Sequence, residues 1–340
     1  MRIRRLDIQK LPSLYREVLQ REVEKLKRQD EVVAIGLAGS VARGDFWRGA
    51  DLDIEVILKG DRPKNVVCTE QEISVDYGYF GEAYIQNLPH DTLPIYDPVQ
   101  ILTKALQART KRQLWKKMLL RSLASATKYS EKAQSSLRTD LYSALCLAHV
   151  AATELGSGLI LATGMAPSVR RTISKLEQAM KKIGREDLFR EYVSLYGMPS
   201  TVHRADFFLS QLREGYREIW PYFRGRTIGP KYMIQQPDSE NWFRNRIEPI
   251  YENDKRDLVW IVFVEYHFVL EYILRTIGRE DFPDNVFTEL KDITRPPALW
   301  INRYRDILKL IPETDVPNLV TKVQKLLNEL QTIASTRYLR

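Results

Sequence analysis

Two aspartates separated by one residue are the strongest chemical feature of this 340-residue chain. Asp51-Leu52-Asp53 opens an apolar segment, residues 52–58, which the alternation of its side chains predicts as a strand. Positions i and i+2 of a strand face the same side, so the two carboxylates lie together while the apolar neighbours face the core. Carboxylate oxygens are the ligands that Mg²⁺ and Mn²⁺ prefer. The spacing therefore predicts a divalent metal site at Asp51 and Asp53.

A glycine–serine pair precedes these acids. Gly39-Ser40 ends an apolar run, residues 32–38, which reads as a buried strand, and a short helix is expected around residues 41–43. Glycine lets backbone N–H groups approach phosphates closely, and the serine hydroxyl can donate one more hydrogen bond. The helix would aim its N-terminus at the same anions, and Arg43 is placed to contact a phosphate oxygen. We therefore expect Gly39, Ser40 and Arg43 to bind a nucleotide.

Together, the two features suit nucleotidyl transfer. Two metal ions about 4 Å apart can activate a nucleophile and neutralise the leaving pyrophosphate. Each feature alone is common, but an apolar strand, Gly-Ser and a hydrophobically flanked Asp-x-Asp in succession resemble the signature of the polymerase-β-like nucleotidyltransferase superfamily. Arg43-Gly44 matches its kanamycin/aminoglycoside nucleotidyltransferase-like branch.

The resemblance implies a third carboxylate on a later, neighbouring strand. Asp76 stands in a strand-like segment, residues 73–78, and would complete the metal site and accept the proton of the attacking hydroxyl. Glu55 shares the strand face of the Asp pair and is its competitor. Glu70 and Glu72 are weaker alternatives.

The likeness to the kanamycin enzymes continues through residues 93–97 into a helical bundle. Those enzymes use a glutamate of the first bundle helix as general base, for which Glu131 is the candidate here. Glu131 is the only acid among ten Lys and Arg residues between Lys104 and Arg138. This basic stretch would repel a cationic drug and favours anionic partners, or it is simply a solvated helix face.

The remaining patterns predict an α+β fold, with a small mixed-sheet nucleotidyltransferase domain followed by helical-bundle domains. Helical spacing within residues 1–30 includes Leu6 and Ile8, further strands are expected at 66–69 and 72–80, and Asp97-Pro98 should begin the first long helix. We expect a catalytic domain over 1–110 and an acceptor-side bundle over 111–228. A mainly helical region without assigned role follows over 231–340, after a linker at 224–230.

Composition indicates the cellular compartment and whether a membrane span is expected. Net charge is +8, and the two cysteines have no metal-ligand spacing, which favours a reducing compartment. The apolar segment 258–274 contains Glu265, His267 and Glu271, so it predicts a buried helix and no membrane span. The four histidines show no zinc-ligand spacing and are expected in core or surface positions. We expect a cytoplasmic protein.

The sequence thus predicts an enzyme that transfers a nucleoside monophosphate, most simply AMP from ATP, to a hydroxyl with the aid of Mg²⁺ or Mn²⁺. The expected acceptor is a small molecule. Transfer to RNA or to a protein side chain is one alternative, and a non-catalytic module that binds RNA or protein is another.

Overall fold

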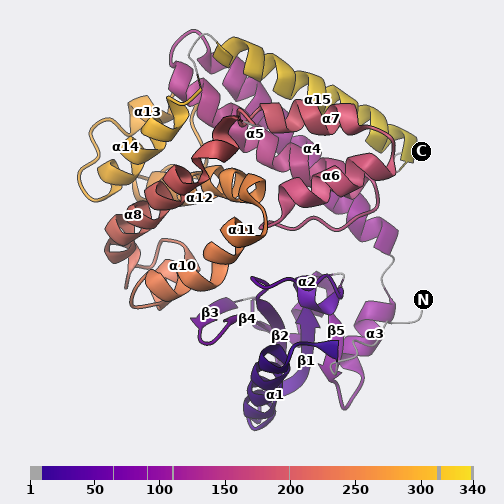
Figure 1. Ribbon diagram of the computed structural model, residues 1–340. Coiled ribbons are helices and arrows are strands. Elements are labelled where there is room, and N and C mark those ends of the chain that lie inside the picture. Colours follow the sequence, from indigo (N-terminus) through magenta and orange to yellow (C-terminus); the bar gives the residue numbers. More distant parts are fainter. Residues whose placement is uncertain are drawn as a thin grey trace. The chain divides into compact units, whose positions relative to one another are not determined.

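The computed structural model describes residues 10–63, 65–89, 91–108, 111–198, 200–311 and 315–337 (Figure 1). Contacts divide the chain into two compact units: Met1–Leu114 with Lys231–Pro249, and Trp115–Pro230 with Ile250–Arg340. The chain therefore leaves the first unit at the start of its second third and returns to it briefly. Residue 110, an expected domain boundary, lies outside the described residues. The three consecutive domains stay a prediction, while the contacts group residues 231–249 with the N-terminal part.

The first unit is built on a five-stranded mixed sheet with the order β3-β4-β2-β1-β5. Its strands are β1 (Val32–Ala38), β2 (Leu52–Leu58), β3 (Asn65–Glu70), β4 (Ser74–Gly81) and β5 (Leu93–Tyr96). β2 and β4 run parallel, and all other neighbours are antiparallel. The helices of this unit are α1 (Ser13–Lys27), α2 (Gly39–Ala42), the 3₁₀ helix η2 (Glu82–Asn87), α3 (Ile101–Gln107), α9 (Lys231–Gln235) and α10 (Glu240–Arg246).

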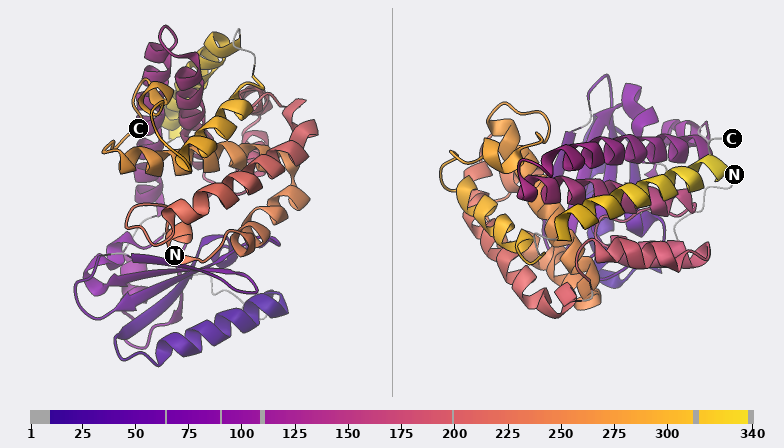
Figure 2. Two further views of the ribbon diagram at one scale, coloured as in Figure 1. Left: turned by 90° about the vertical axis from the view of Figure 1, so that its left-hand side faces the viewer. Right: turned by 90° about the horizontal axis from the view of Figure 1, so that it is seen from above.

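The two central strands follow the apolar runs of the sequence. β1 and β2 have the expected bounds, and nearly all their side chains are buried, because the sheet is covered on both faces. α1 lies along the sheet (Figure 2, left) and buries Val18, Leu19 and Val23 at helical spacing. Leu6 and Ile8, which the helical pattern included, lie outside the described residues. The α+β fold with a small mixed sheet is confirmed.

The start of the first long helix differs from the expectation. α3 begins beyond Pro98, which is therefore not its first residue, and Gln100 at its N-cap position has a left-handed backbone (φ 58°). Asp97 caps the helix nevertheless, since its carboxylate accepts hydrogen bonds from the backbone N–H groups of Leu102 (3.2 Å) and Thr103 (2.7 Å). The carboxylate reaches over the intervening turn, which a rule based on adjacent residues does not foresee.

The second unit is helical. Its members are α4 (Lys111–Ser136, beginning in the first unit), α5 (Leu141–Ala162), α6 (Thr172–Lys182), α7 (Glu186–Ser194), the 3₁₀ helix η3 (Ser200–Arg204), α8 (Ala205–Phe223), α11 (Glu248–Asn253, also shared), α12 (Lys255–Thr276), α13 (Val286–Glu289), α14 (Pro297–Leu308) and α15 (Val316–Arg337). α5 and α15 lie side by side (Figure 2, right).

Two helices of this unit form its apolar centre. α5 is long and apolar enough to cross a membrane, but 78% of its most apolar window is buried inside the structure, as in the core helix of a globular unit. α12 contains the segment 258–274, and most of its apolar residues are buried as expected, whereas Phe268 is exposed. His149 and His267 also lie in this core, where burial lowers the pKa of His149 to about 4. Both histidines are packing residues.

Candidate metal and nucleotide site

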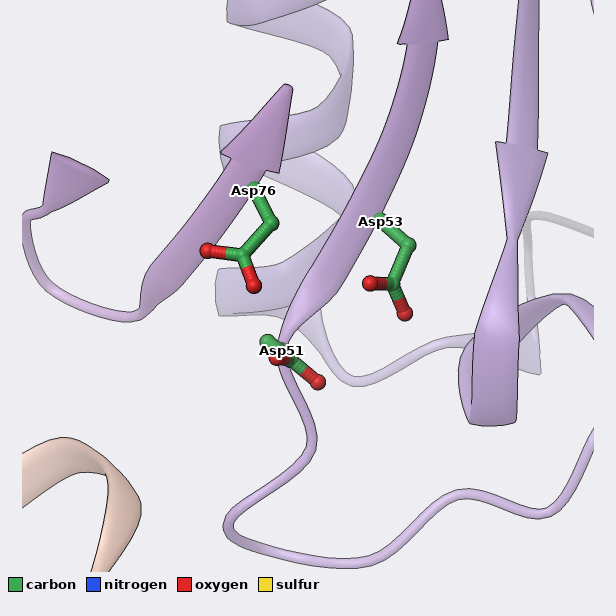
Figure 3. Close-up of side chains that lie close together, drawn as sticks. All are labelled: Asp51, Asp53 and Asp76. Carbon is green, nitrogen blue, oxygen red and sulfur yellow. The ribbon is translucent and has the colours of Figure 1, made fainter. Parts of the chain in front are cut away.

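Three aspartates meet where β2 and β4 begin. Asp53 on β2 is the direct parallel neighbour of Asp76 on β4, and Asp51 immediately precedes β2. One carboxylate oxygen of each residue lies within 4.8 Å of those of the other two, and all three side chains are partly exposed (Figure 3). The structure thus brings together the three carboxylates that the sequence singled out, although Asp51 precedes the strand instead of lying on it.

The donor set of this cluster fits a divalent cation. Three carboxylates supply hard oxygen ligands with enough negative charge to bind an ion such as Mg²⁺ or Mn²⁺. Their partial exposure leaves a path for solvent and ligand. Within the described parts of the chain, this is the one group of acidic, histidine or cysteine side chains with such a geometry.

The competing carboxylates lie elsewhere. Glu55 is on β2 but is only 5% exposed, and the cluster contains Asp76 in its place. The side chain of Glu70 is buried and accepts hydrogen bonds from Ser74 and Asn245. Glu72 pairs with Arg21 at the surface, 3.1 Å away. Glu131 is exposed on α4 in the second unit, and its role as a base stays a prediction.

Gly39 lies directly against the carboxylate of Asp53. Its φ of +74° is a left-handed conformation that glycine adopts without strain. A Cβ at this position would lie 1.8 Å from Oδ2 of Asp53. The closeness follows from the sheet, because Ala38, next to Gly39, pairs with Asp53 in the β1–β2 ladder. The lack of a side chain on Gly39 therefore leaves room for the Asp53 carboxylate and also keeps the backbone of Gly39 accessible.

The other two expected nucleotide-binding residues follow in α2, which has only four residues. Ser40 is half-buried, and its carbonyl oxygen accepts a hydrogen bond from the Asp45 N–H (2.9 Å). Arg43 forms an ion pair with the largely buried carboxylate of Asp91. Asp91 thus fixes the guanidinium, and contact of Ser40 or Arg43 with a phosphate stays a prediction.

Sequence reasoning missed one residue of the site, Arg246. This arginine ends α10 and is 5% exposed. Its Nη1 donates to Asp76 Oδ2 (3.0 Å) and lies 3.3 Å from Asp51 Oδ2, its Nη2 donates to the other Asp76 oxygen, and its Nε donates to Glu70 (2.7 Å). A signal existed, since Arg246 shares the buried face of α10 with Trp242. A charge on an apolar helix face usually has a buried partner.

The three aspartates lie inside a segment that matches a known protein family. Residues 19–118 match the family model described as a nucleotidyltransferase domain, so the chain contains a nucleotidyltransferase domain with a candidate catalytic acidic triad. No curated protein matches the sequence. Among solved structures, the chain is similar to a nucleotidyltransferase-like protein from Exiguobacterium sibiricum, with 13% identity, 82% of this chain and 87% of that chain covered, and a TM-score of 0.32. The closer likeness to kanamycin enzymes receives no support from these matches.

Proposed function

We propose that this protein transfers a nucleoside monophosphate, most simply AMP from ATP, to a hydroxyl group. The proposal is carried by the convergence of Asp51, Asp53 and Asp76 within 4.8 Å beside the Gly39 turn, inside a nucleotidyltransferase domain. Three carboxylates this close repel one another, so a divalent ion bound between them would be strongly attracted.

Each residue has a distinct part in this proposal. Asp51, Asp53 and Asp76 would hold Mg²⁺ or Mn²⁺, which when bound supplies positive charge against the triphosphate. By the resemblance to the polymerase-β-like nucleotidyltransferases, Asp76, which lies beside Asp53 in the strand register, is also the candidate acceptor of the hydroxyl proton. Gly39 and Ser40 offer backbone N–H groups and a hydroxyl to the phosphates. Arg43, fixed by Asp91, would contact a phosphate from the same turn.

We favour a small-molecule acceptor. The basic stretch from Lys104 to Arg138 is weaker evidence for a nucleic-acid acceptor than its composition suggests, because Lys128 and Lys132 on α4 form ion pairs with Asp281 at 2.5 and 3.0 Å. Side chains at positions 109–112 lie outside the described residues. Three cations of the stretch, Lys116, Lys117 and Arg121, are exposed on α4 and keep an RNA acceptor as the second candidate.

The test is a transfer assay with ATP labelled at the α-phosphate. The protein is incubated with Mg²⁺ or Mn²⁺ and, separately, with hydroxyl-bearing small molecules, RNA and protein, and the label is followed into each. We expect label in a small-molecule product, and none with Asp53→Asn. Label in RNA or in protein would move the acceptor to the alternative class. Metal-dependent ATP binding without transfer to any acceptor class would favour the non-catalytic binding module.

A further inference from the structure

The guanidinium of Arg246 lies among the carboxylates to which the proposed function assigns the metal. Its Nη1 and Nη2 groups, which form the fork of the guanidinium, donate hydrogen bonds to the two oxygens of Asp76. Nη1 also approaches Asp51, and Nε donates to Glu70. Bidentate, charge-assisted bonds of this kind are among the strongest polar contacts in proteins. Arg246 therefore fixes the orientation of Asp76, with its charge directly beside the metal-ligand candidates.

The segment that carries Arg246 is firmly attached to the sheet. At the β3 edge, Gln235 accepts from the Cys68 N–H (2.8 Å) and donates to the Val66 carbonyl (3.1 Å), and Gln236 donates to the Cys68 carbonyl. These amides satisfy backbone groups of an edge strand that would otherwise lack partners. Asn245, next to Arg246, donates to Glu70 (3.1 Å). Arg246 is thus a fixed part of this unit.

The arginine is charged in this position. A guanidinium keeps its proton in proteins, and here its N–H groups donate to the carboxylates of Asp76 and Glu70. A permanent positive charge beside a metal site repels further cations, and the low exposure of Arg246 keeps solvent screening small.

We propose that Arg246 is a built-in cation of this site that orients Asp76 and limits the carboxylates to one divalent ion. The inference rests on the proposed function, because it concerns the same carboxylates. Arg246 takes the electrostatic part that a second ion has in two-metal transfer sites. The site would then depend on a residue that lies 170 positions from Asp76 in the sequence.

The experiment counts the Mn²⁺ ions bound per chain by titration followed with electron paramagnetic resonance. Removing Arg246 alone would leave Glu70 buried without its cation, so the comparison is made in a Glu70→Gln background. We expect one ion for the natural protein and for Glu70→Gln, and two ions for Glu70→Gln/Arg246→Gln. Arg244→Gln, an equal charge loss at an exposed position of α10, is the control and should leave the count at one.

Equal counts for Glu70→Gln with and without Arg246→Gln would overturn the role of Arg246. Adding Asp53→Asn to these variants separates this failure from failure of the proposed function. If Asp53→Asn removes the bound Mn²⁺, the metal site at the three aspartates is supported even when the role of Arg246 fails. If Asp53→Asn leaves Mn²⁺ binding undiminished, the ions bind elsewhere, which contradicts both the metal site and the role of Arg246. Arg246→Lys is a second variant that keeps a charge near Glu70 but lacks the fork. We expect it to bind Mn²⁺ more weakly than the natural protein, because the repelling charge stays while Asp76 loses its fixed orientation, and unchanged affinity would contradict an orienting role.

Discussion

The carboxylate of Asp53 occupies the space that a side chain on Gly39 would need. A Cβ there would lie 1.8 Å from Oδ2 and 2.9 Å from Cγ of Asp53. Contacts this short are impossible, so either the backbone of the turn or the aspartate has to move. Gly39 thus belongs to the metal-ligand geometry as much as to the phosphate turn.

Gly39→Ala is therefore expected to abolish transfer and to weaken Mn²⁺ binding. Gly44→Ala is the matched control, since Gly44 also has a left-handed backbone (φ +70°) but nothing lies within 4 Å of its would-be Cβ. We expect Gly44→Ala to cost roughly 1–2 kcal/mol of stability through backbone strain and to keep metal binding. Melting curves and Mn²⁺ titrations of both variants check this. Equal Mn²⁺ affinity for the two would show that Asp53 tolerates the methyl group.

Asp51→Asn and Asp53→Asn are each expected to reduce transfer below detection while the melting temperature changes little, because both side chains are partly exposed at the start of β2. Asp45→Asn, in the loop before them, is the control and should keep its activity. Turnover is measured as labelled product in the presence of Mg²⁺. Near-normal turnover by either site variant would mean that the carboxylate cluster is not the catalytic metal site.

Ser40→Ala is expected to weaken ATP binding by about 10- to 150-fold, since a hydrogen bond to a charged group contributes roughly 1.5–3 kcal/mol. Calorimetric titration with a non-hydrolysable ATP analogue and Mg²⁺ gives the affinity. Unchanged affinity for the ATP analogue would show that Gly39-Ser40 is only a structural turn.

Stability of the helical unit should depend on pH through Asp257. Its buried carboxylate on α12 accepts hydrogen bonds from the backbone N–H groups of Ile173 (2.7 Å) and Ser174 (3.3 Å) at the start of α6, and burial raises its pKa to about 6. The folded protein then holds this proton more tightly than the unfolded chain, so the contribution is present at pH 4 and is lost as pH rises through 6. The loss is on the order of 3 kcal/mol.

Urea unfolding at pH 4.5 and 7.5 tests this dependence. Asp257→Asn should lose less stability between the two values than the natural protein. Asp281 is the opposite case, because its three donors Lys128, Tyr129 and Lys132 outweigh the effect of burial and lower its pKa to about 2. Asp281→Asn should therefore leave the slope between pH 4.5 and 7.5 unchanged. A slope identical in Asp257→Asn and the natural protein would contradict the raised pKa.

The parts of the site that lie close in sequence were predictable. The bounds of β1 follow from a continuous apolar run that ends at Gly39. Those of β2 follow from the alternation of acidic and apolar side chains that begins after Asp51. The approach of Asp76 to Asp53 came from a family likeness, since the parallel β2–β4 pairing leaves no local signal. Arg246 was not predicted as a residue of the site, because only the return of residues 231–249 to the first unit brings it to the carboxylates.

A metal-dependent nucleotide site is tested most sharply by calorimetric titration of the protein with a non-hydrolysable ATP analogue, with and without Mg²⁺, for the natural sequence and for Asp53→Asn. We expect binding that requires the metal and that Asp53→Asn abolishes. Binding of equal strength without the metal, or binding that survives Asp53→Asn unchanged, would contradict a metal-dependent nucleotide site at Asp51, Asp53 and Asp76.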